Sequence, residues 1–298
     1  MKVLNFGSLN LDYVYQVDHM VTPGETLASA GMETFLGGKG FNQSVALARA
    51  GVPVFHAGLI GEDGGAFLTA CESSGVDARY IRAVPGRTGH TIIQVDRNGQ
   101  NCILLYGGSN RLVTREYVDE VLSDFSQGDL LILQNEINLL DYIIDQAWNK
   151  GLQIVLNPSP FDRALDSCDL GKVSYLLLNE VEGEQLCRAS EPEQILSEIL
   201  RQYPEMKIVL TLGEKGAVYG DKSTRCRQAA CTIGPVVDTT AAGDTFTGYF
   251  VAGILADLPI QENLARCALA SGIAITRPGA ISSIPTRAEI ERSDPDKL

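Results

Sequence analysis

Apolar segments of two lengths alternate along the chain, and their pattern predicts alternating strands and helices. Short, mostly apolar runs such as residues 54–60 and 130–133 have the length of buried strands. Longer segments with apolar residues every three or four positions, such as residues 41–50, predict helices. Parallel strands need a long crossover between them, usually a helix. The alternation therefore indicates an α/β fold with a mostly parallel sheet covered by helices on both faces.

The predicted elements follow one another over most of the chain. Strands are expected at residues 3–7, 54–60, 130–133, 154–157, 175–178 and 208–212. Helices are expected at residues 41–50, 66–75, 115–122, 139–150, 192–202, 244–255 and from 262 onward.

Two segments depart from this alternation. Residues 13–36 contain the turn Thr22-Pro-Gly-Glu25 and predict a small β excursion from the main fold. Residues 88–95 and 101–107 predict a hairpin around Asp96-Arg-Asn-Gly99. At the end of the chain, the composition of the tail after Ser293 predicts fraying.

The stretch from Asp238 to Gly248 joins a turn of small residues to the start of a helix. It reads Asp-Thr-Thr-Ala-Ala-Gly-Asp-Thr-Phe-Thr-Gly, and the small residues at 241–243 let a ligand approach the backbone. The first amides of a helix have no partner within it and its dipole favours anions, so the turn predicts a phosphoryl site. A carboxylate at Asp244 suits such a site if it takes a proton from an attacking hydroxyl. A Gly-Asp pair by itself is more often a helix cap.

A second glycine turn, Gly37-Gly-Lys-Gly40, also leads into a predicted helix. A Walker loop would have Ser or Thr after Gly-Lys, and a dinucleotide loop would have a third glycine where Gln43 stands. The turn matches neither. We expect its glycines to admit a ligand beside the backbone, with Lys39 and Asn42 reaching that ligand.

Polar side chains come at or just after the carboxyl ends of several predicted strands. Asn10 and Asp12 are two positions apart, so both point to one face of an extended segment. They fit a polyol site or, alternatively, an Asx turn. Glu136, Asn179 and Thr211 also fall at strand ends, although Glu136 taken alone is more often a surface residue. Because ligands of open parallel sheets bind at the carboxyl ends of the strands, these residues are candidates for one site.

Composition and charge exclude several classes of partner. The 298 residues include 24 basic and 37 acidic side chains, a formal net charge of −13, which disfavours nucleic acids and anionic membranes as partners. No apolar run approaches the ~20 residues needed to span a bilayer. The first residues resemble a strand rather than a signal peptide, so we expect a cytoplasmic protein. Seven scattered cysteines without a Cys-x-x-Cys pair indicate neither a redox nor a zinc site.

The two turns together resemble the paired signatures of a known family. Gly37-Gly-Lys-Gly-Phe-Asn42 and Asp238-Thr-Thr-Ala-Ala-Gly-Asp244 occur in this order about 200 residues apart, as in the ribokinase-like carbohydrate kinases, or PfkB family. The resemblance is strongest to the ribokinases and extends from about residue 3 to residue 290. It implies one three-layer α/β/α sandwich domain over residues 1–298 with a small β lid, formed by about residues 13–36 and 88–109. In several members the lids of two subunits pack together, so the resemblance also implies a homodimer through the lids.

The resemblance implies a role for each candidate residue. The residues that would contact sugar hydroxyls are Asn10, Asp12, Gly38, Lys39, Asn42 and Glu136. Asp244 would bind the primary hydroxyl and act as its base, with the amides of Ala241, Ala242 and Gly243 as the anion hole. The residues that would line the ATP site are Thr211, Gly213 and Gly216, together with the segment 265–279 around the adenine.

The resemblance also implies binding sites for two cations. Asn179 and Glu182 match an element that organises Mg²⁺ and phosphates, largely through water; taken alone, the pair is typical of a helix cap. The residues that resemble the family's monovalent-cation loop, usually a K⁺ site, are Asp238, Thr240 through its carbonyl, Gly279 and Ser283.

Three positions depart from the family pattern. Ala241 stands where the family more often has glycine, although ribokinases commonly share this alanine. Thr91 replaces a small apolar residue of the ribokinase lid pocket, so the sugar could differ in one substituent. Ala268 stands where ribokinases have a histidine near the nucleotide base. His90 is not assigned to the site, because a lone histidine is more often structural.

These observations favour an ATP-dependent kinase that phosphorylates the primary hydroxyl of a pentose, with D-ribose, converted to ribose 5-phosphate, as the first candidate. A kinase for another pentose, for deoxyribose or for a nucleoside such as pseudouridine is the nearest alternative. A sugar-binding regulator without catalysis is disfavoured by the presence of Asp244 and the whole anion turn. A nicotinamide dehydrogenase is disfavoured by the glycine spacing.

Overall fold

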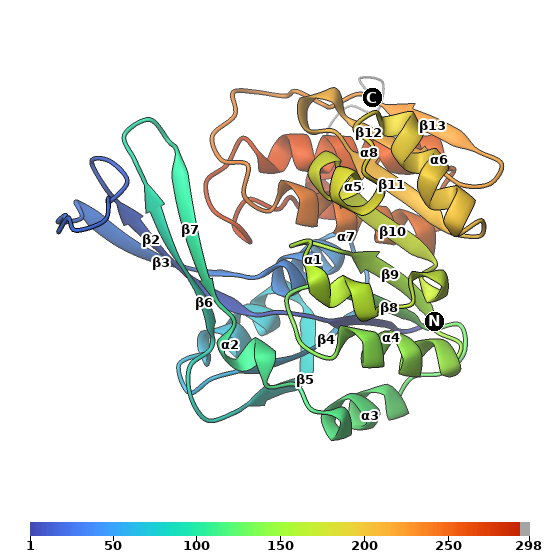
Figure 1. The fold of residues 1–298 in the computed structure, drawn as a ribbon, viewed down its shortest axis with the longest axis horizontal. Coiled ribbons are helices and arrows are strands. Elements are labelled where there is room, and N and C mark those ends of the chain that lie inside the picture. Colours follow the sequence, from blue (N-terminus) through green and yellow to red (C-terminus); the bar gives the residue numbers. More distant parts are fainter. Residues whose placement is uncertain (293–298) are drawn as a thin grey trace.

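The computed structural model of the chain describes residues 1–292 and is shown as a ribbon in Figure 1. The tail after Ser293, for which the sequence predicts fraying, lies outside the described residues. Within residues 1–292 the chain forms one sheet of nine strands and a second of four. This architecture confirms the predicted α/β class with a mostly parallel main sheet and a small additional β unit.

The larger sheet has the strand order β13-β12-β11-β10-β9-β8-β1-β4-β5. Its strands are β1 (Val3–Phe6), β4 (Val54–Ile60), β5 (Val76–Ala83), β8 (Leu130–Gln134), β9 (Gln153–Asn157), β10 (Tyr175–Asn179), β11 (Lys207–Thr211), β12 (Ala217–Gly220) and β13 (Arg225–Gln228). The strands from β11 to β5 are parallel, whereas β12 and β13 run antiparallel to their neighbours. Residues 212–216 alone join β11 to β12, and a connection that short allows only antiparallel pairing.

Helices cover both faces of this sheet. They are α1 (Lys39–Arg49), α2 (Ala66–Ser74), α3 (Arg115–Ser123), α4 (Leu140–Asn149), α5 (Glu180–Cys187), α6 (Pro192–Gln202), α7 (Ala242–Leu255), α8 (Ile260–Ala274) and α9 (Arg287–Arg292). One apolar core packs the sheet against α3, α4 and α6, and the other packs it against α1, α2, α7 and α8 (Figure 1). Residues of β8 alternate between them, with Leu131 and Leu133 in the first core and Leu130 and Ile132 in the second. A strand buried on both faces needs apolar side chains at every position, which explains its uninterrupted apolar run.

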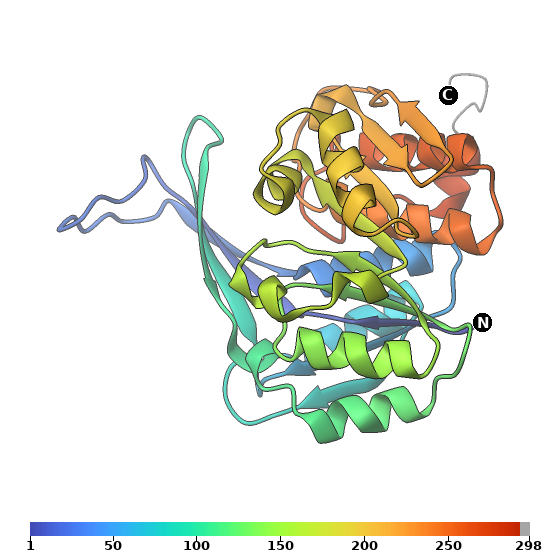
Figure 2. The same cartoon turned by 45° about the vertical axis from the view of Figure 1, so that its right-hand side comes forward.

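The smaller sheet, which we call the second sheet, consists of β3 (Gly31–Gly37), β2 (Asn10–Gln16), β6 (Gly89–Val95) and β7 (Asn101–Tyr106), in that order. It projects beyond the body of the molecule, as Figures 1 and 2 show. Because only three residues separate β1 from β2, the first segment of the chain leads directly from one sheet into the other. The predicted β excursion and the predicted hairpin are therefore parts of one sheet.

The structure confirms most of the predicted elements and corrects a few. The strand at residues 54–60 and the helix at residues 192–202 have the predicted bounds. The helix predicted at 244–255 begins two residues earlier, at Ala242, which places Asp244 inside the first turn. Strands β5, β12 and β13 have no counterpart in the sequence prediction, because β5 carries charged side chains among its apolar residues and the other two are short. None of the described helices has both the length and the apolar character required to cross a bilayer.

Candidate active site

The amino-terminal ends of α1 and α7 meet at the carboxyl ends of the parallel strands (Figure 1). The two helices approach closely because a glycine faces an alanine: a Cβ at Gly248 would lie 2.4 Å from the Cβ of Ala46. Each helix follows a residue with positive φ, Gly38 at 91° and Ala241 at 59°. The chain therefore turns sharply into each helix. At α1 the first amides already have acceptors, because Lys39 donates to Glu136 and Gly40 to the hydroxyl of Ser8. Ala241 carries a side chain in this left-handed region, at a cost of about 1–2 kcal/mol.

Asp244 lies in the first turn of α7, and both of its carboxylate oxygens accept hydrogen bonds from α1. Asn42 Nδ2 donates to Oδ2 and Gln43 Nε2 donates to Oδ1, each at 2.9 Å. The aspartate is 7% exposed, and neither partner is charged. The N-cap of α7 is Ala241, so Asp244 is not the capping residue that an isolated Gly-Asp pair would suggest. It is a buried carboxylate held by neutral amides, with lone pairs available for a proton.

Asn10 and Asp12 lie at the start of β2 and point to the same face, as their spacing predicts, rather than forming an Asx turn. Asn10 Oδ1 accepts a hydrogen bond from Asn110 Nδ2 at 2.8 Å. Asp12 Oδ1 accepts one from Thr91 Oγ1 at 2.5 Å, across the ladder that pairs β2 with β6. The carboxylate lies over Gly37, where a Cβ would be 2.0 Å from Oδ2. The second sheet thus contributes two oriented polar groups to the edge of the site.

Glu136 follows β8 and reaches the first turn of α1. Its Oε2 accepts a hydrogen bond from the backbone amide of Lys39 at 3.0 Å and a short one from the hydroxyl of Ser8. The side chain is partly buried, so it belongs to the interior of the site rather than to the surface. The structure therefore places Glu136 beside the glycine turn.

Two carboxylates and one lysine in this region have shifted pKa values. Burial, together with the charges of Glu136 and Asp244, raises the pKa of Asp12 to about 6. Burial also raises the pKa of Glu136, although Lys39 opposes the shift. Burial would lower the pKa of Lys39, but the nearby carboxylates, Asp244 first, outweigh it and raise that pKa. At neutral pH the lysine is charged and Asp12 is ionised.

A cavity of about 240 Å³ lies between Asp244 and the carboxyl ends of β9, β10 and β11. Its lining includes Lys39, Asn179, Glu182, Thr211 and residues 241–243. The amide of Ala242 donates to the carbonyl of Thr239 at 3.2 Å. The amides of Ala241 and Gly243 have no acceptor among residues 1–292. Of the three amides predicted to form the anion hole, two are open for a ligand and the third is used by the turn.

Asn179 and Glu182 form the helix cap that their spacing allows. Asn179 Oδ1 accepts from the amide of Glu182 at 2.9 Å, and Glu182 Oε2 accepts from the amide of Asn179 at 3.0 Å, a reciprocal capping box at the start of α5. The other carboxylate oxygen of Glu182 has no partner among the described residues, and both residues line the 240 Å³ cavity. The capping role and a role in the cavity are therefore compatible.

A larger cavity of about 680 Å³ adjoins the first one. The two share part of their lining, namely Thr211, Thr239, Ala242 and Gly243. The other walls include Gly213, Gly216, Ala268, Ser271, Gly272 and Ile275. Its walls are mostly apolar, and they contain both the predicted nucleotide turn and part of the segment 265–279. The hydroxyl of Ser271 also donates to the carbonyl of Ala242 at 3.0 Å, which ties α8 to the anion turn.

The residues predicted to bind a monovalent cation lie together beside this turn. Asp238 Oδ1 accepts from the amide of Thr240 and Oδ2 from the amide of Gly279, both at 2.9 Å. The Ser283 hydroxyl is buried and donates to the carbonyl of Ala280 at 2.8 Å. Burial opposes the charge on Asp238, but the hydrogen bonds from Thr240 and Gly279 outweigh it and lower the pKa of Asp238.

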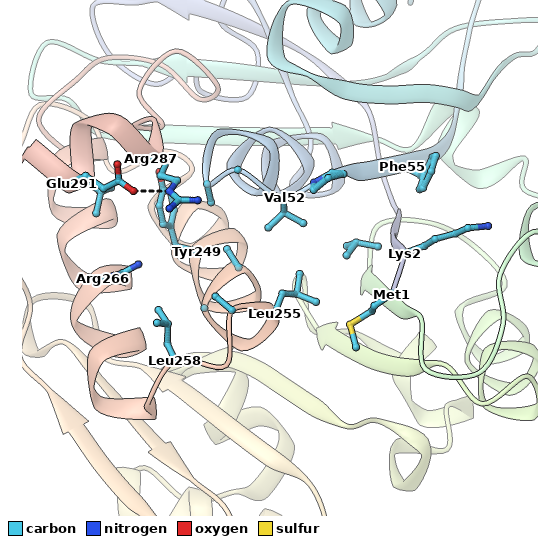
Figure 3. Close-up of a pocket in the computed structure, with 18 residues that line it drawn as sticks. Met1, Lys2, Val52, Phe55, Tyr249, Leu255, Leu258, Arg266, Arg287 and Glu291 are labelled. Carbon is cyan, nitrogen blue, oxygen red and sulfur yellow. Dashed lines mark hydrogen bonds and ion pairs between the residues drawn. The ribbon is translucent and has the colours of Figure 1, made fainter.

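A third cavity, of about 670 Å³, lies at the opposite end of α7 (Figure 3). Most of its lining is apolar, including Val52, Phe55 and Leu255. Its two arginines are in ion pairs, and Lys2 Nζ donates to the carbonyl of Asp124 at 2.8 Å. The Arg287 guanidinium lies 2.6 Å from the carboxylate of Glu291, the pair drawn as a dashed line in Figure 3. Helix α7 has 14 residues at about 1.5 Å each, so this cavity lies about 20 Å from the anion turn.

Three residues that shape the site have no role in the sequence prediction. They are Ser8, Gln43 and Asn110. A signal for Gln43 exists in the sequence, because positions 42–44 place three polar residues in a row in an otherwise apolar helix. Ser8, Gln43 and Asn110 are all buried, and buried polar side chains are almost always hydrogen-bonded. No comparable local signal points to Ser8 or Asn110.

The chain is similar to known proteins over nearly its whole length. Residues 1–287 match the pfkB family carbohydrate kinases. A ribokinase of Haemophilus influenzae is 34% identical over 293 residues, covering 95% of each chain. A deoxyribokinase of Salmonella typhi is 29% identical over 297 residues, covering 96% of each. The structure of Arabidopsis thaliana ribokinase complexed with ribose and ATP has a TM-score of 0.85 and 26% identity, covering 98% of this chain and 97% of that one.

Proposed function

The chain belongs to the pfkB family of carbohydrate kinases, and from this premise we propose that it transfers the γ-phosphoryl group of ATP to the primary hydroxyl of a pentose, D-ribose first. The observation that carries the proposal is the buried carboxylate of Asp244 beside the open amides of the turn that begins α7. The carboxylate takes the hydroxyl proton, and the amides bind the charge that develops on the phosphoryl oxygens.

The acceptor side of the proposed site has groups that match a polyhydroxyl sugar. Asn10 and Asp12 on β2 and Glu136 after β8 converge with Lys39 on the glycine turn. Asn42 Oδ1 is buried and has no donor among the described residues. A buried oxygen of this kind needs a donor, and a sugar hydroxyl would supply one. We propose that these five side chains bind the sugar, with the second sheet as the lid over it.

The donor side matches a nucleoside triphosphate. The mostly apolar cavity of about 680 Å³ would hold the adenosine between α8 and the turn at Gly213 and Gly216, and the adjoining 240 Å³ cavity would hold the terminal phosphates. The shared lining residue Gly243 would lie where the two parts of ATP join. ATP bound in this way would have its γ-phosphorus next to Asp244. The similar Arabidopsis thaliana ribokinase, whose structure is complexed with ribose and ATP, supports the same assignment.

Two cations form part of the proposal because the residues present fit them. The free carboxylate oxygen of Glu182 in the phosphate cavity fits a hydrated Mg²⁺, which prefers oxygen ligands and keeps several waters. The carboxylate of Asp238 and the carbonyls of the adjacent turns, including that of Thr240, are the hard oxygen donors that suit K⁺. The magnesium would neutralise phosphate charge, and the potassium would order the anion turn.

The second sheet also carries the proposed dimer contact. Its edge strand β7 is exposed along its length, and Ile103, Leu104 and Tyr106 are 56%, 67% and 57% exposed. Apolar side chains on an open sheet edge favour pairing with another chain. We propose a homodimer through the two lids; sedimentation at the mass of one chain would contradict it.

We also propose a cytoplasmic location, where ATP is available and the seven free cysteines stay reduced.

A kinase for deoxyribose is the second candidate, and Thr91 favours it. Its hydroxyl occupies one oxygen of Asp12 and leaves that carboxylate fewer positions for sugar hydroxyls. The deoxyribokinase relative is consistent with this alternative. A nucleoside such as pseudouridine would need additional room for its base.

An acceptor panel tests the proposal. ATP consumption would be measured with ribose, 2-deoxyribose, other pentoses, fructose and nucleosides, and with 5-deoxyribose as a matched control that lacks the primary hydroxyl. We expect the highest kcat/KM with ribose and no turnover with 5-deoxyribose. A higher kcat/KM for 2-deoxyribose would select the alternative, and no turnover with any acceptor would favour a sugar-binding regulator.

A further inference from the structure

The two amides that hold Asp244 differ in their surroundings. Asn42 and Gln43 are neighbours in the first turn of α1, and each donates to one carboxylate oxygen. Asn42 Oδ1 has no donor among the described residues, so the Asn42 amide can turn to a ligand. Gln43 is fully buried, and both its nitrogen and its oxygen are hydrogen-bonded. The two residues are therefore suited to different tasks.

Behind Gln43 a chain of buried amides leads away from the site. Gln43 Oε1 accepts from Gln134 Nε2 at 2.7 Å, and the same nitrogen donates to Asn5 Oδ1 at 3.0 Å. Asn5 Nδ2 in turn donates to the backbone carbonyl of Gly40 at 2.7 Å and to the hydroxyl of Ser44 at 2.9 Å. Asn5, Gln43 and Gln134 are all fully buried. The chain thus connects α1, β1 and β8 to the carboxylate on α7.

The direction of every amide in this chain follows from its ends. The Gly40 carbonyl can only accept, so Asn5 must present its NH₂ group there and its oxygen to Gln134. Gln134 then presents its NH₂ group to the oxygen of Gln43. Gln43 is left with its NH₂ group facing Asp244, whose carboxylate can only accept when ionised. The interior of the protein thus holds the Gln43 donor in one orientation without help from the ligand.

The backbone is shaped to admit this chain. A Cβ at Gly7, just after β1, would lie 2.2 Å from Gln134 Oε1 and 2.7 Å from the Cα of Gly40. Any side chain at this position would displace the amides. At the far end, Ser44 Oγ lies 2.8 Å from His56 Nδ1. Burial lowers the pKa of His56 to about 3, so the ring adds no charge to the chain at neutral pH.

We propose that Gln43 is a positioning residue for the phosphoryl transfer: it anchors Asp244 Oδ1 throughout the reaction, while Asn42 leaves Oδ2 for the sugar. The inference rests on the proposed kinase function. When Asn42 turns to a sugar hydroxyl, Oδ2 becomes the oxygen that takes the proton of the primary hydroxyl. The hydroxyl oxygen then forms its bond to the γ-phosphorus, and the bond from that phosphorus to the bridging oxygen breaks, with the electron pair leaving on ADP.

The test compares the wild type with Gln43→Met, which keeps the length of the side chain and removes both polar groups. Loss of a hydrogen bond to a charged group is expected to lower kcat about 10- to 100-fold. Sugar affinity, measured by calorimetry without ATP, should change less than about threefold, because Asn42 and the other sugar contacts remain. The acid limb of the kcat profile should move to higher pH, since the carboxylate loses a hydrogen-bond donor that favours its charged form.

Two further variants separate positioning from folding. Gln134→Met leaves every atom of Gln43 in place but removes the donor to Gln43 Oε1, so the acid limb should move in the same direction by a smaller amount. Asn263→Ala is the matched control: Asn263 is also a buried amide, and it donates to the carbonyl of Phe250 near the other end of α7. It should lower the melting temperature without moving the acid limb.

Three outcomes decide the matter. An active wild type with an unchanged kcat and acid limb in Gln43→Met would overturn the inference and leave the proposed function intact. Parallel losses of kcat and sugar affinity with a fixed acid limb in both glutamine variants would overturn it as well, by showing a structural role. A wild type that phosphorylates no acceptor would overturn the proposed function and this inference with it.

Discussion

The two ends of helix α7 carry charge in opposite ways. At its amino-terminal end, Asp244 is buried against neutral amides and Lys39 lies near several carboxylates without an ion pair among residues 1–292. At its carboxyl-terminal end, the two arginines at the third cavity are paired, Arg287 with Glu291 and Arg266 with Glu262. The two large cavities have nearly the same volume, about 680 and 670 Å³.

The difference lies in which polar groups are left open. A folded chain gains little from a buried carboxylate that lacks a cation, so such a group indicates chemistry rather than stability. Paired charges at the rim of an apolar cavity need no such explanation. The candidate active site therefore differs from the opposite end of the same helix in its open amides and in a buried carboxylate without an ion pair. The size of the cavity does not distinguish the two ends.

The largest effect is expected from Asp244→Asn, which removes the proposed base and keeps the shape of the side chain. Turnover should fall by about 10²–10⁴-fold or more, because general-base catalysis contributes that much. Sugar affinity should change little. The matched control is Asp257→Asn, the same substitution just past the other end of α7, where the residue is exposed and its φ of 52° suits asparagine. Normal turnover in Asp244→Asn would end the assignment of the base.

A pH dependence of sugar binding is expected from Asp12. Its pKa of about 6 means that the carboxylate is ionised above pH 6 and protonated below it. The affinity for the sugar should therefore be constant at higher pH and fall as the pH drops through about 6. In Thr91→Val the carboxylate loses a hydrogen bond that stabilises its charged form, so this midpoint should move to higher pH. A dissociation constant that is flat from pH 5 to 8 in both proteins would remove Asp12 from the sugar site.

A smaller effect is expected from the monovalent cation. Potassium should raise turnover several-fold over sodium, because an ion held by Asp238 would order the anion turn that follows it. Asp238→Asn should abolish the difference between the two salts, whereas a surface variant such as Glu205→Gln should retain it. The measurement is kcat at constant ionic strength with one cation exchanged for the other. Equal rates in the two salts for the wild type would exclude the cation site.

The smallest effect is expected at the opposite end of α7. Glu291→Gln breaks an exposed ion pair with Arg287, and such pairs contribute little to stability. Turnover, sugar affinity and melting temperature should stay within experimental error of the wild type. A clear loss of activity in this variant would mean that the third cavity communicates with the active site, and the contrast between the two ends would fail.

Much of the fold and part of the site follow from local features of the sequence. The parallel strands other than β5 are buried on two faces and so appear as short apolar runs. Each glycine turn marks a helix start where a ligand meets the backbone. The candidate groups around Asp244, Lys39 and Asn42 depend on these local signals, and the structure brings them together.

What the sequence does not predict depends on contacts between distant segments. The orientation of Gln43 is set by residues 38 positions before it and 91 positions after it in the chain. Thr91 meets Asp12 only because β2 pairs in parallel with β6. The start of α7 at Ala242 depends on a left-handed alanine, a conformation that propensity disfavours. Pairing register and side-chain networks of this kind have no local pattern in the sequence.

The most direct test of the account is a crystal structure with D-ribose and a non-hydrolysable ATP analogue. We expect the primary hydroxyl oxygen within about 2.6–3.2 Å of an Asp244 carboxylate oxygen, the range in which a base can take its proton. The terminal phosphate should lie on the other side of that hydroxyl, against the amides of the turn at 241–243. A primary hydroxyl directed away from Asp244, or a sugar bound outside the contacts of Asn10, Asp12 and Glu136, would contradict the account.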